Sequence, residues 1–163
     1  ARIQEGVNSL AGYGEIFLNN ENVENEIRTL EVSKFVSRIA EISEVRRKLV
    51  EQQQQMGKNK GVVMDGRDIG TVVFPNAELK LFMNASANTR AKRRFNELTK
   101  KGENVTFNEI LENVQSRDHI DSTRADSPLL MANDAIEIDN SNLTLVEQFD
   151  KIYTIVKTKI DSL

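Results

Sequence analysis

Two short polar segments carry the residue types that phosphate chemistry requires. The first, DGRDIGTVVFP at residues 65–75, follows an apolar run and holds Asp65, Arg67 and Asp68 among glycines. Arginine can bind a phosphate through two parallel N–H donors, glycine lets backbone approach a ligand, and carboxylates can order a magnesium shell. The alternative is a turn in which the aspartates cap backbone groups and the arginine pairs with one of them. Spacing alone leaves both interpretations open.

The second segment, RDHIDSTRADSPL at residues 117–129, places Arg117, Asp121 and Arg124 four and three residues apart. On a helix this spacing is typical of a ladder of surface ion pairs, and spacing alone favours that interpretation. In the functional interpretation, Arg124 binds a phosphate and Asp121 binds a sugar hydroxyl. The single histidine, His119, is interpreted as a helix-surface residue rather than a base.

Three further arginines, Arg90, Arg93 and Arg94, lie on one face of a predicted helix. Such a group is usually a solvated face. The alternative is a clamp on a polyphosphate, because planar guanidinium groups match pairs of phosphate oxygens. Ser37 and Arg46 lie upstream in an amphipathic segment, where spacing alone suggests ordinary helix surface.

Apolar runs that alternate with helical patterns would position these side chains. Runs at residues 61–65, 79–85 and 135–139 predict three strands, and helical patterns separate them. This alternation is typical of a parallel sheet covered by helices, so the predicted fold class is α/β. Ligands of such sheets bind beyond the carboxyl ends of the strands.

Residues that can cap exposed amides mark the helix starts. Thr106 with Glu109, and Thr144 with Glu147, have the spacing of a capping box. The pattern of the last helix assigns its apolar face to core packing. Other helix starts are predicted at Thr29, Ser43 and Ser86, and a strand followed by a turn is predicted within residues 13–23.

Composition excludes several classes of protein. The 163 residues suffice for one domain or a core with a small appendage, and 39% hydrophobic with 29% charged residues suits a globular protein. The net charge of -3 argues against nucleic-acid and membrane-surface binding. The chain has no cysteine, which excludes disulfides and cysteine zinc sites. No apolar run approaches the ~18 residues of a membrane span. We expect a soluble, cytoplasmic protein.

Taken together, residues 23–53, 61–86, 90–98 and 117–129 resemble bacterial cytidylate kinases, which are nucleoside monophosphate kinases. The resemblance implies ATP-dependent phosphorylation of CMP or dCMP with magnesium, in pyrimidine nucleotide metabolism. It also implies a P-loop kinase-like parallel sheet flanked by helices and incomplete in this chain. Residues 1–60 would form an NMP-binding insert with connecting helices, and residues 61–163 a partial core with a helical lid at about 90–127.

The resemblance assigns roles residue by residue. Ser37, Arg46 and Asp68 fall where the family contacts the cytosine, and Asp121 falls where it meets the sugar. Arg67 and Arg124 fall where the family holds the CMP phosphate. Arg93, Arg94 and Arg117 fall on the mobile lid that closes over ATP. Asp65 falls where it would order the waters of the magnesium ion. The resemblance makes Arg67, Asp65 and Arg124 the catalytic residues.

The N-terminal motif of the cytidylate kinase family is absent from this sequence. The family begins with a strand and a glycine-rich GK[ST] loop that holds the ATP phosphates, and no G-x-x-x-x-G-K-[ST] occurs here. We expect that a full-length protein contains this segment and that the 163-residue chain alone is inactive. The alternatives are a non-catalytic nucleotide-binding module and a helical interaction domain.

Overall fold

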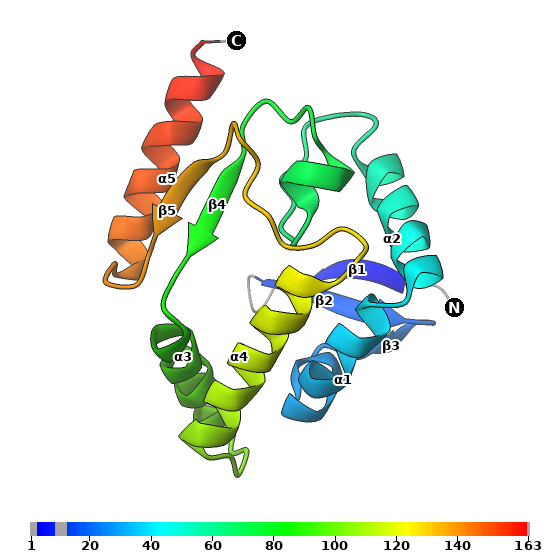
Figure 1. The fold of residues 1–163 in the computed structure, drawn as a ribbon, viewed down its shortest axis with the longest axis vertical. Coiled ribbons are helices and arrows are strands. Elements are labelled where there is room, and N and C mark those ends of the chain that lie inside the picture. The colour runs from blue at the N-terminus through cyan, green and yellow to red at the C-terminus, as the bar shows by residue number, and fades with distance from the viewer. Residues whose placement is uncertain (1–2, 9–12, 163) are drawn as a thin grey trace. The chain divides into compact units, whose positions relative to one another are not determined.

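A computed structural model describes residues 3–8 and 13–162 (Figure 1). Contacts divide the chain into two compact units, Ala1–Ile39 and Ala40–Leu163. Each unit has its own sheet, antiparallel in the first and parallel in the second. The mixture of helices with a small parallel sheet confirms the predicted α/β class.

The first unit contains a three-stranded antiparallel sheet. Strand β2 (Tyr13–Leu18) pairs with β1 (Ile3–Asn8) on one side and with β3 (Glu21–Asn22) on the other. The turn between β2 and β3 contains Asn19 and Asn20, with φ values of 52° and 72°. Asparagine tolerates this left-handed conformation better than most residues. The sequence predicted β2 and its turn but missed the two strands that pair with it.

A short helical stretch follows this sheet. Helix η1 (Glu26–Arg28) leads into α1 (Leu30–Ala40). Thr29 Oγ1 accepts a hydrogen bond of 3.3 Å from the amide of Val32, which confirms the predicted helix start.

The second unit begins with α2 (Ser43–Met56), whose predicted start at Ser43 is confirmed. After the helix, Lys60 and Gly61 both have left-handed backbones, with φ values of 56° and 65°. The strand predicted at residues 61–65 is wrong, because the described residues form no strand there and Val63 is fully exposed. An apolar run becomes a strand only when a neighbouring strand pairs with its backbone groups.

Two parallel strands form the sheet of the second unit. Strand β4 (Leu81–Asn84) pairs with β5 (Ile136–Asp139). Parallel strands need a long crossover, and here α3 (Ala87–Lys100) and α4 (Phe107–Thr123) supply it. The two later strands predicted from the sequence are therefore confirmed.

Helices α3 and α4 pack against each other over a small apolar core. Leu98 and Ile110 are almost completely buried. Phe95 and Phe107 meet edge to face, with ring centroids 6.3 Å apart. Such a pair stabilises the packing beyond its buried area by about 0.5–1.5 kcal/mol.

Three of the predicted helix starts in the second unit have the expected side-chain cap, whereas the cap position before Ser43 is Ile42, which makes no side-chain cap hydrogen bond. Ser86 Oγ accepts a hydrogen bond from the amide of Thr89 at 3.1 Å. Complete capping boxes begin the two later helices, with the pairs Thr106–Glu109 and Thr144–Glu147. Each cap satisfies amides that the helix itself leaves without a partner.

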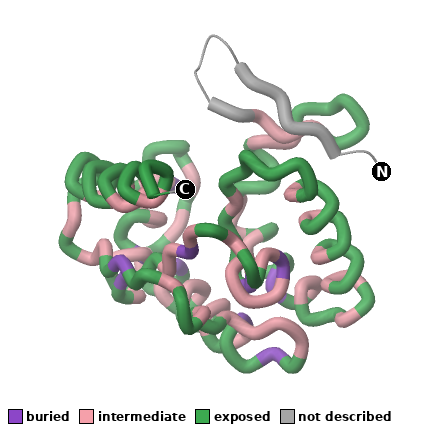
Figure 2. The backbone as a smooth tube through the Cα atoms, turned by 90° about the horizontal axis from the view of Figure 1, so that it is seen from above, coloured by how far each residue is buried: buried purple, intermediate pink, exposed green. Residues whose placement is uncertain are grey.

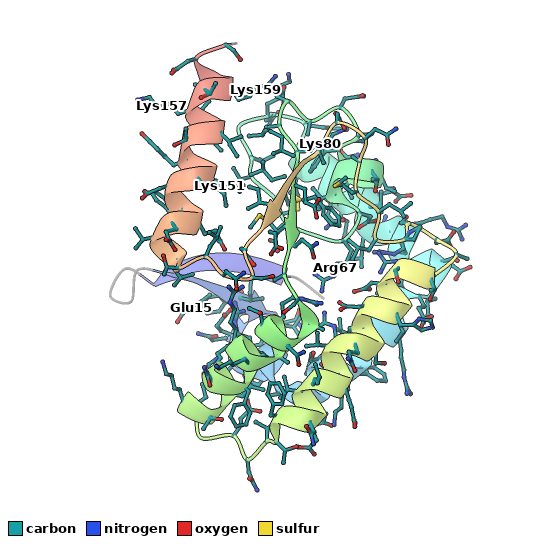
Figure 3. All side chains as sticks on the ribbon, turned by 60° about the vertical axis from the view of Figure 1, so that its left-hand side comes forward. Glu15, Arg67, Lys80, Lys151, Lys157 and Lys159 are labelled. Atoms are coloured by element: carbon teal, nitrogen blue, oxygen red, sulfur yellow. The ribbon has the colours of Figure 1, made fainter. Side chains whose placement is uncertain are left out.

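Lys80, immediately before β4, is a buried ammonium group with an exposed side-chain fraction of 7%. It donates hydrogen bonds to the carbonyl of Pro75 at 2.5 Å and to the carboxylate of Asp134 at 2.8 Å. The pair lowers the pKa of Asp134 below its ordinary value. Lys80 therefore ties three segments of the chain together at the start of the parallel strands (Figure 3).

Helix α5 (Leu145–Ile160) ends the second unit and has no buried residue (Figure 2). Val146, Phe149 and Tyr153 are each more than half exposed. The core packing predicted for this face is therefore absent in the described part of the chain, because a two-stranded sheet offers little area to cover it. Within that part, no helix is both long and apolar enough to cross a membrane.

Candidate functional site

The backbone around Asp68 is held by an unusual π-helical turn, η2 (Ile69–Val73). The carbonyl of Asp68 accepts hydrogen bonds from the amides of Thr71, Val72 and Val73 at 3.3, 2.9 and 3.2 Å. Because three donors share one acceptor, the backbone of residue 68 has little freedom. Turns of this kind occur often at functional sites.

Asp68 and Arg46 form a buried pair that is incompletely satisfied. Arg46 Nη2 lies 3.6 Å from Asp68 Oδ1, and the side chains are 11% and 6% exposed. Arg46 Nε donates to the carbonyl of Ala40 at 3.2 Å, which fixes the guanidinium from the other side. Among the described residues, Arg46 Nη1 and Asp68 Oδ2 are buried without a hydrogen-bond partner. Buried polar atoms are nearly always bonded to protein or water, so this donor and acceptor are each open to a further partner.

Asp121, in the last turn of α4, joins two arginines from different segments. Its Oδ2 accepts from Arg67 Nε at 3.0 Å, and its Oδ1 accepts from Arg124 Nη1 at 2.8 Å. The Asp121 side chain is 6% exposed, whereas Arg67 is 45% exposed. Arg67 therefore keeps donors that a ligand can reach, and Figure 3 shows it beside the end of α4.

Arg124 is held on two sides. Besides Asp121, it contacts the carbonyl of Ser127, which accepts from its Nε at 2.9 Å and from its Nη2 at 2.7 Å. The side chain is only 3% exposed. Burial and the positive charge of Arg46 lower the pKa of Arg124, while Asp121 opposes this shift. Sequence analysis missed Ser127, although its Ser-Pro dipeptide is a typical turn signal.

A local excess of positive charge surrounds these aspartates. Arg117 is half-buried, and its pKa is lowered by burial and then by the charge of Arg67. Four guanidinium groups thus influence two carboxylates, within a chain whose net charge is -3. An anion bound here would relieve their mutual repulsion.

A pocket of about 240 Å³ lies beside Arg46. Arg46 forms part of its wall, together with the apolar side chains of Val50 and Val72. The rest of the lining includes Asp126 and Ser127 from the loop after α4. Arg47 and Glu51 complete the lining, so five of its seven residues are polar or charged.

The second unit brings six of the predicted site residues into this cluster: Arg46, Arg67, Asp68, Arg117, Asp121 and Arg124. Ser37 lies on α1 in the first unit, so its predicted contact with cytosine stays a prediction. Asp65 is exposed on the segment before Arg67. The roles of all these residues likewise stay predictions.

The surface ion-pair ladder that spacing favoured for α4 is wrong. Asp121 and Arg124 do pair, three residues apart, but both are buried. Periodicity gives the distance between two side chains on a helix, whereas burial depends on segments far away in the sequence. Here the partners of the pair include Arg67, 54 residues from Asp121.

The arginines of α3 bind partners outside the cluster. Arg93 donates to the backbone and side-chain oxygens of Asn140 at 2.6 and 3.0 Å, at the end of β5. Arg94 donates to Glu97 at 2.8 Å, one turn along its own helix. Arg93 therefore binds outside the cluster, whereas the charge of Arg94 lowers the pKa of Arg117 within it.

The described residues offer few ligands for a resident metal ion. No group of three or more His, Asp or Glu side chains in the described residues could hold one. The exposed carboxylate of Asp65 is a single hard ligand. Magnesium typically uses one or two carboxylates together with substrate phosphates, so the residues fit a magnesium ion that arrives with a nucleotide.

The match to a family model covers almost the whole chain: residues 2–158 match the model described as cytidylate kinase. The chain belongs to the cytidylate kinase family. A cytidylate kinase of Flavobacterium johnsoniae is 64% identical over 156 residues, which cover 94% of this chain and 68% of the relative. That of Flavobacterium psychrophilum is 64% identical, covering 91% and 66%. That of Bacteroides fragilis is 60% identical, covering 84% and 60%.

The chain thus spans about two thirds of the length of these curated relatives. The resemblance noted from the sequence motifs is confirmed, and the family is one of phosphotransferases. The clustered residues lie inside the matched region of the family model.

Proposed function

We propose that this chain supplies the CMP-binding part of an enzyme that phosphorylates CMP or dCMP with ATP. The observation that carries the proposal is the unsatisfied pair in the buried cluster, Arg46 Nη1 and Asp68 Oδ2. One is a donor and the other an acceptor. A ligand that presents an acceptor beside a donor would satisfy both.

Cytosine presents this pattern on its base-pairing edge. Its exocyclic amino group would donate a hydrogen bond to the carboxylate of Asp68. Its adjacent ring nitrogen and carbonyl would accept hydrogen bonds from Arg46. Uracil has a carbonyl in place of the amino group, so Asp68 would repel it. We propose that Ser37 adds a further contact to the base.

The phosphate and sugar would occupy the other half of the cluster. Arg67 is partly exposed and has donors beyond the one that binds Asp121. Together with Arg124 it would hold the CMP phosphate, while Asp121 would accept from a sugar hydroxyl. Charge-assisted bonds of this kind contribute roughly 1.5–3 kcal/mol each.

The residue types suit phosphoryl transfer. An oxygen of the CMP phosphate is itself the nucleophile, so the protein has to position it and stabilise charge, without a histidine or cysteine base. Arg67 and Arg124 would hold that phosphate in line and offset its charge. Magnesium bound with ATP would neutralise the transferred group, and Asp65 would orient its waters. Arg93, Arg94 and Arg117 would approach the ATP phosphates when the α3–α4 pair moves.

Calorimetric titration of the 163-residue chain with CMP, UMP and CMP plus ATP tests the binding part. We expect CMP to bind at least about tenfold more tightly than UMP, which corresponds to about 1.4 kcal/mol. Asp68→Asn should remove most of this preference, because an amide can orient toward either base. Glu78→Gln, a change in an exposed ion pair with Lys60, serves as the matched control and should keep it. Equal affinities for CMP and UMP in the unmodified chain would refute the base assignment.

A coupled assay for ADP release separates the enzyme from a non-catalytic binding module. The sequence contains no G-x-x-x-x-G-K-[ST], so the chain alone should show no turnover. The same chain preceded by a strand and a loop with that motif should phosphorylate CMP. If the extended protein binds both nucleotides yet transfers nothing, the binding module becomes the better account.

A further inference from the structure

The loop after α4 contains a strained residue next to the arginine proposed to hold the CMP phosphate. Ser127 has a φ of 52°, in the left-handed region that non-glycine residues seldom adopt. It also precedes Pro128, and a residue before proline is restricted further. Residues kept in such conformations cluster at ligand clamps and switch regions, where surrounding contacts hold them.

The conformation of Ser127 directs its carbonyl onto the guanidinium of Arg124. That one oxygen accepts from both Nε and Nη2, at 2.9 and 2.7 Å. The loop is anchored on its far side, where the amide of Leu129 donates to the carbonyl of Asp121 at 2.7 Å. We call this contact between the Ser127 carbonyl and the Arg124 side chain the clasp.

The clasp occupies the edge of the guanidinium that suits a phosphate best. Nε and Nη2 form a planar fork that can bind two oxygens of one anion. Nη1 already donates to Asp121. With the clasp closed the Arg124 side chain is 3% exposed, which leaves a phosphate almost no access to it.

We propose that Ser127 is a positioning residue for Arg124, whose carbonyl occupies the phosphate-binding fork until the nucleotide phosphate replaces it. The inference rests on the proposed function, since it takes CMP as the ligand. The carbonyl keeps the guanidinium in place through two hydrogen bonds while Asp121 holds Nη1. When the phosphate takes the fork, Ser127 leaves the left-handed region, and the released strain favours the bound state.

The affinity for CMP should therefore depend on how easily residue 127 keeps a positive φ. Glycine adopts such a φ without cost, so Ser127→Gly should stabilise the clasp and weaken CMP binding by about five- to tenfold. Ser127→Val should open the clasp and tighten CMP binding, because a β-branched residue is a marked outlier at this φ. Cytidine has no phosphate to compete for the fork, so its affinity should stay within about twofold. Both ligands are measured by calorimetry on the full chain.

Lys60→Gly is the matched control. Lys60 has a similar φ of 56° and lies on an exposed segment after α2, so glycine there relieves comparable strain far from Arg124 in the sequence. It should leave the ratio of CMP to cytidine affinity unchanged. A ratio that shifts equally in Lys60→Gly and Ser127→Gly would overturn the clasp, because a general gain in rigidity would then explain both.

A direct readout is the Nε–H proton of Arg124 in NMR spectra, assigned by its disappearance in Arg124→Lys. Without ligand it should exchange slowly in the unmodified chain and in Ser127→Gly, and CMP should change its shift. This measurement also serves if Ser127→Val fails to fold. CMP binding with the same affinity ratio in Ser127→Gly overturns the clasp alone, whereas absence of any CMP binding by the unmodified chain overturns the proposed function itself.

Discussion

Two groups of arginines in the second unit have different surroundings. In α3, Arg90 forms two hydrogen bonds with Asp118 of α4, at 2.8 and 2.6 Å, and both side chains are over a third exposed. In the cluster near the end of α4, Arg46 and Arg124 are almost fully buried. One group is satisfied at the surface, whereas the other is buried with an unsatisfied donor at Arg46.

The difference shows how structural and ligand-binding arginines can be told apart. An exposed ion pair contributes little, because water solvates both partners well when they separate. A buried guanidinium loses that solvation and has to recover it from partners. Where the partners inside the protein are too few, a ligand is the natural source of the rest. The comparison therefore predicts a strong effect on CMP binding in the cluster and a weak effect in α3.

The largest effect is expected for Arg124→Ala. It should weaken CMP binding by roughly 1.5–3 kcal/mol or more, because a charged hydrogen-bond donor to the phosphate is lost. Arg124→Lys should not restore it, since a point charge cannot reproduce the fork. Calorimetry with CMP measures the first effect, and the thermal midpoint measures the accompanying loss of stability. A stability loss with unchanged CMP affinity would make Arg124 a purely structural residue.

Arg67→Ala should separate binding from stability more cleanly. The side chain is 45% exposed, so its ion pair with Asp121 should contribute below about 1 kcal/mol to folding. CMP affinity should nevertheless fall by about 1.5 kcal/mol or more, because the phosphate loses a charged donor. The measurements are urea denaturation and calorimetry on the same preparation. A loss of stability larger than the loss of affinity would contradict the role proposed for this exposed arginine.

Arg90→Ala tests the other side of the comparison. It removes the two hydrogen bonds that join α3 to α4 and should lower the free energy of unfolding by up to about 1 kcal/mol. CMP affinity should stay unchanged. Lys48→Ala, which removes an exposed pair within α2, is the control and should change neither quantity measurably. A tenfold loss of CMP affinity in Arg90→Ala would place α3 in the binding site and end the contrast.

The smallest effect concerns acid stability in α3. Burial raises the pKa of Glu97, but hydrogen bonds from Arg94 and Lys101 outweigh it and leave the pKa below its ordinary value of 4.5. A lowered pKa stabilises the folded state above the unfolded value, and this contribution disappears as the pH falls through the folded value. Glu97→Gln should therefore flatten the loss of stability below pH 4.5. Thermal midpoints between pH 3 and 7 would reveal it, and an unchanged slope would contradict it.

The sequence predicted local features best. Caps at Ser86, Thr106 and Thr144 depend on residues three positions away, so their spacing is visible in the sequence. The prediction of a strand at residues 61–65 was wrong because an apolar run does not reveal whether another strand is available to pair with it. The prediction that the apolar face of α5 packs in the core was wrong for a similar reason. A helical pattern shows which face is apolar but not what covers it.

The candidate site was predictable in composition but not in arrangement. Motif resemblance selected Arg46, Asp68 and Arg124 from segments far apart in the sequence. Spacing alone gave the wrong environment for Arg124, because its burial depends on distant residues. The contact between Arg124 and Ser127 could hardly be predicted from the sequence, since its acceptor is a backbone carbonyl, which every residue type has.

The buried ammonium of Lys80 gives this protein an internal reporter for chemical labelling. Amine-reactive reagents attack accessible, deprotonated amines, and Lys80 is 7% exposed whereas Lys48 and Lys60 are 70% and 80% exposed. In the folded chain Lys48 and Lys60 should react first, and Lys80 should react only when the start of the parallel strands opens. Mass spectrometry of the labelled peptide that contains Lys80 would then report opening at the start of the sheet, without any substitution in the chain.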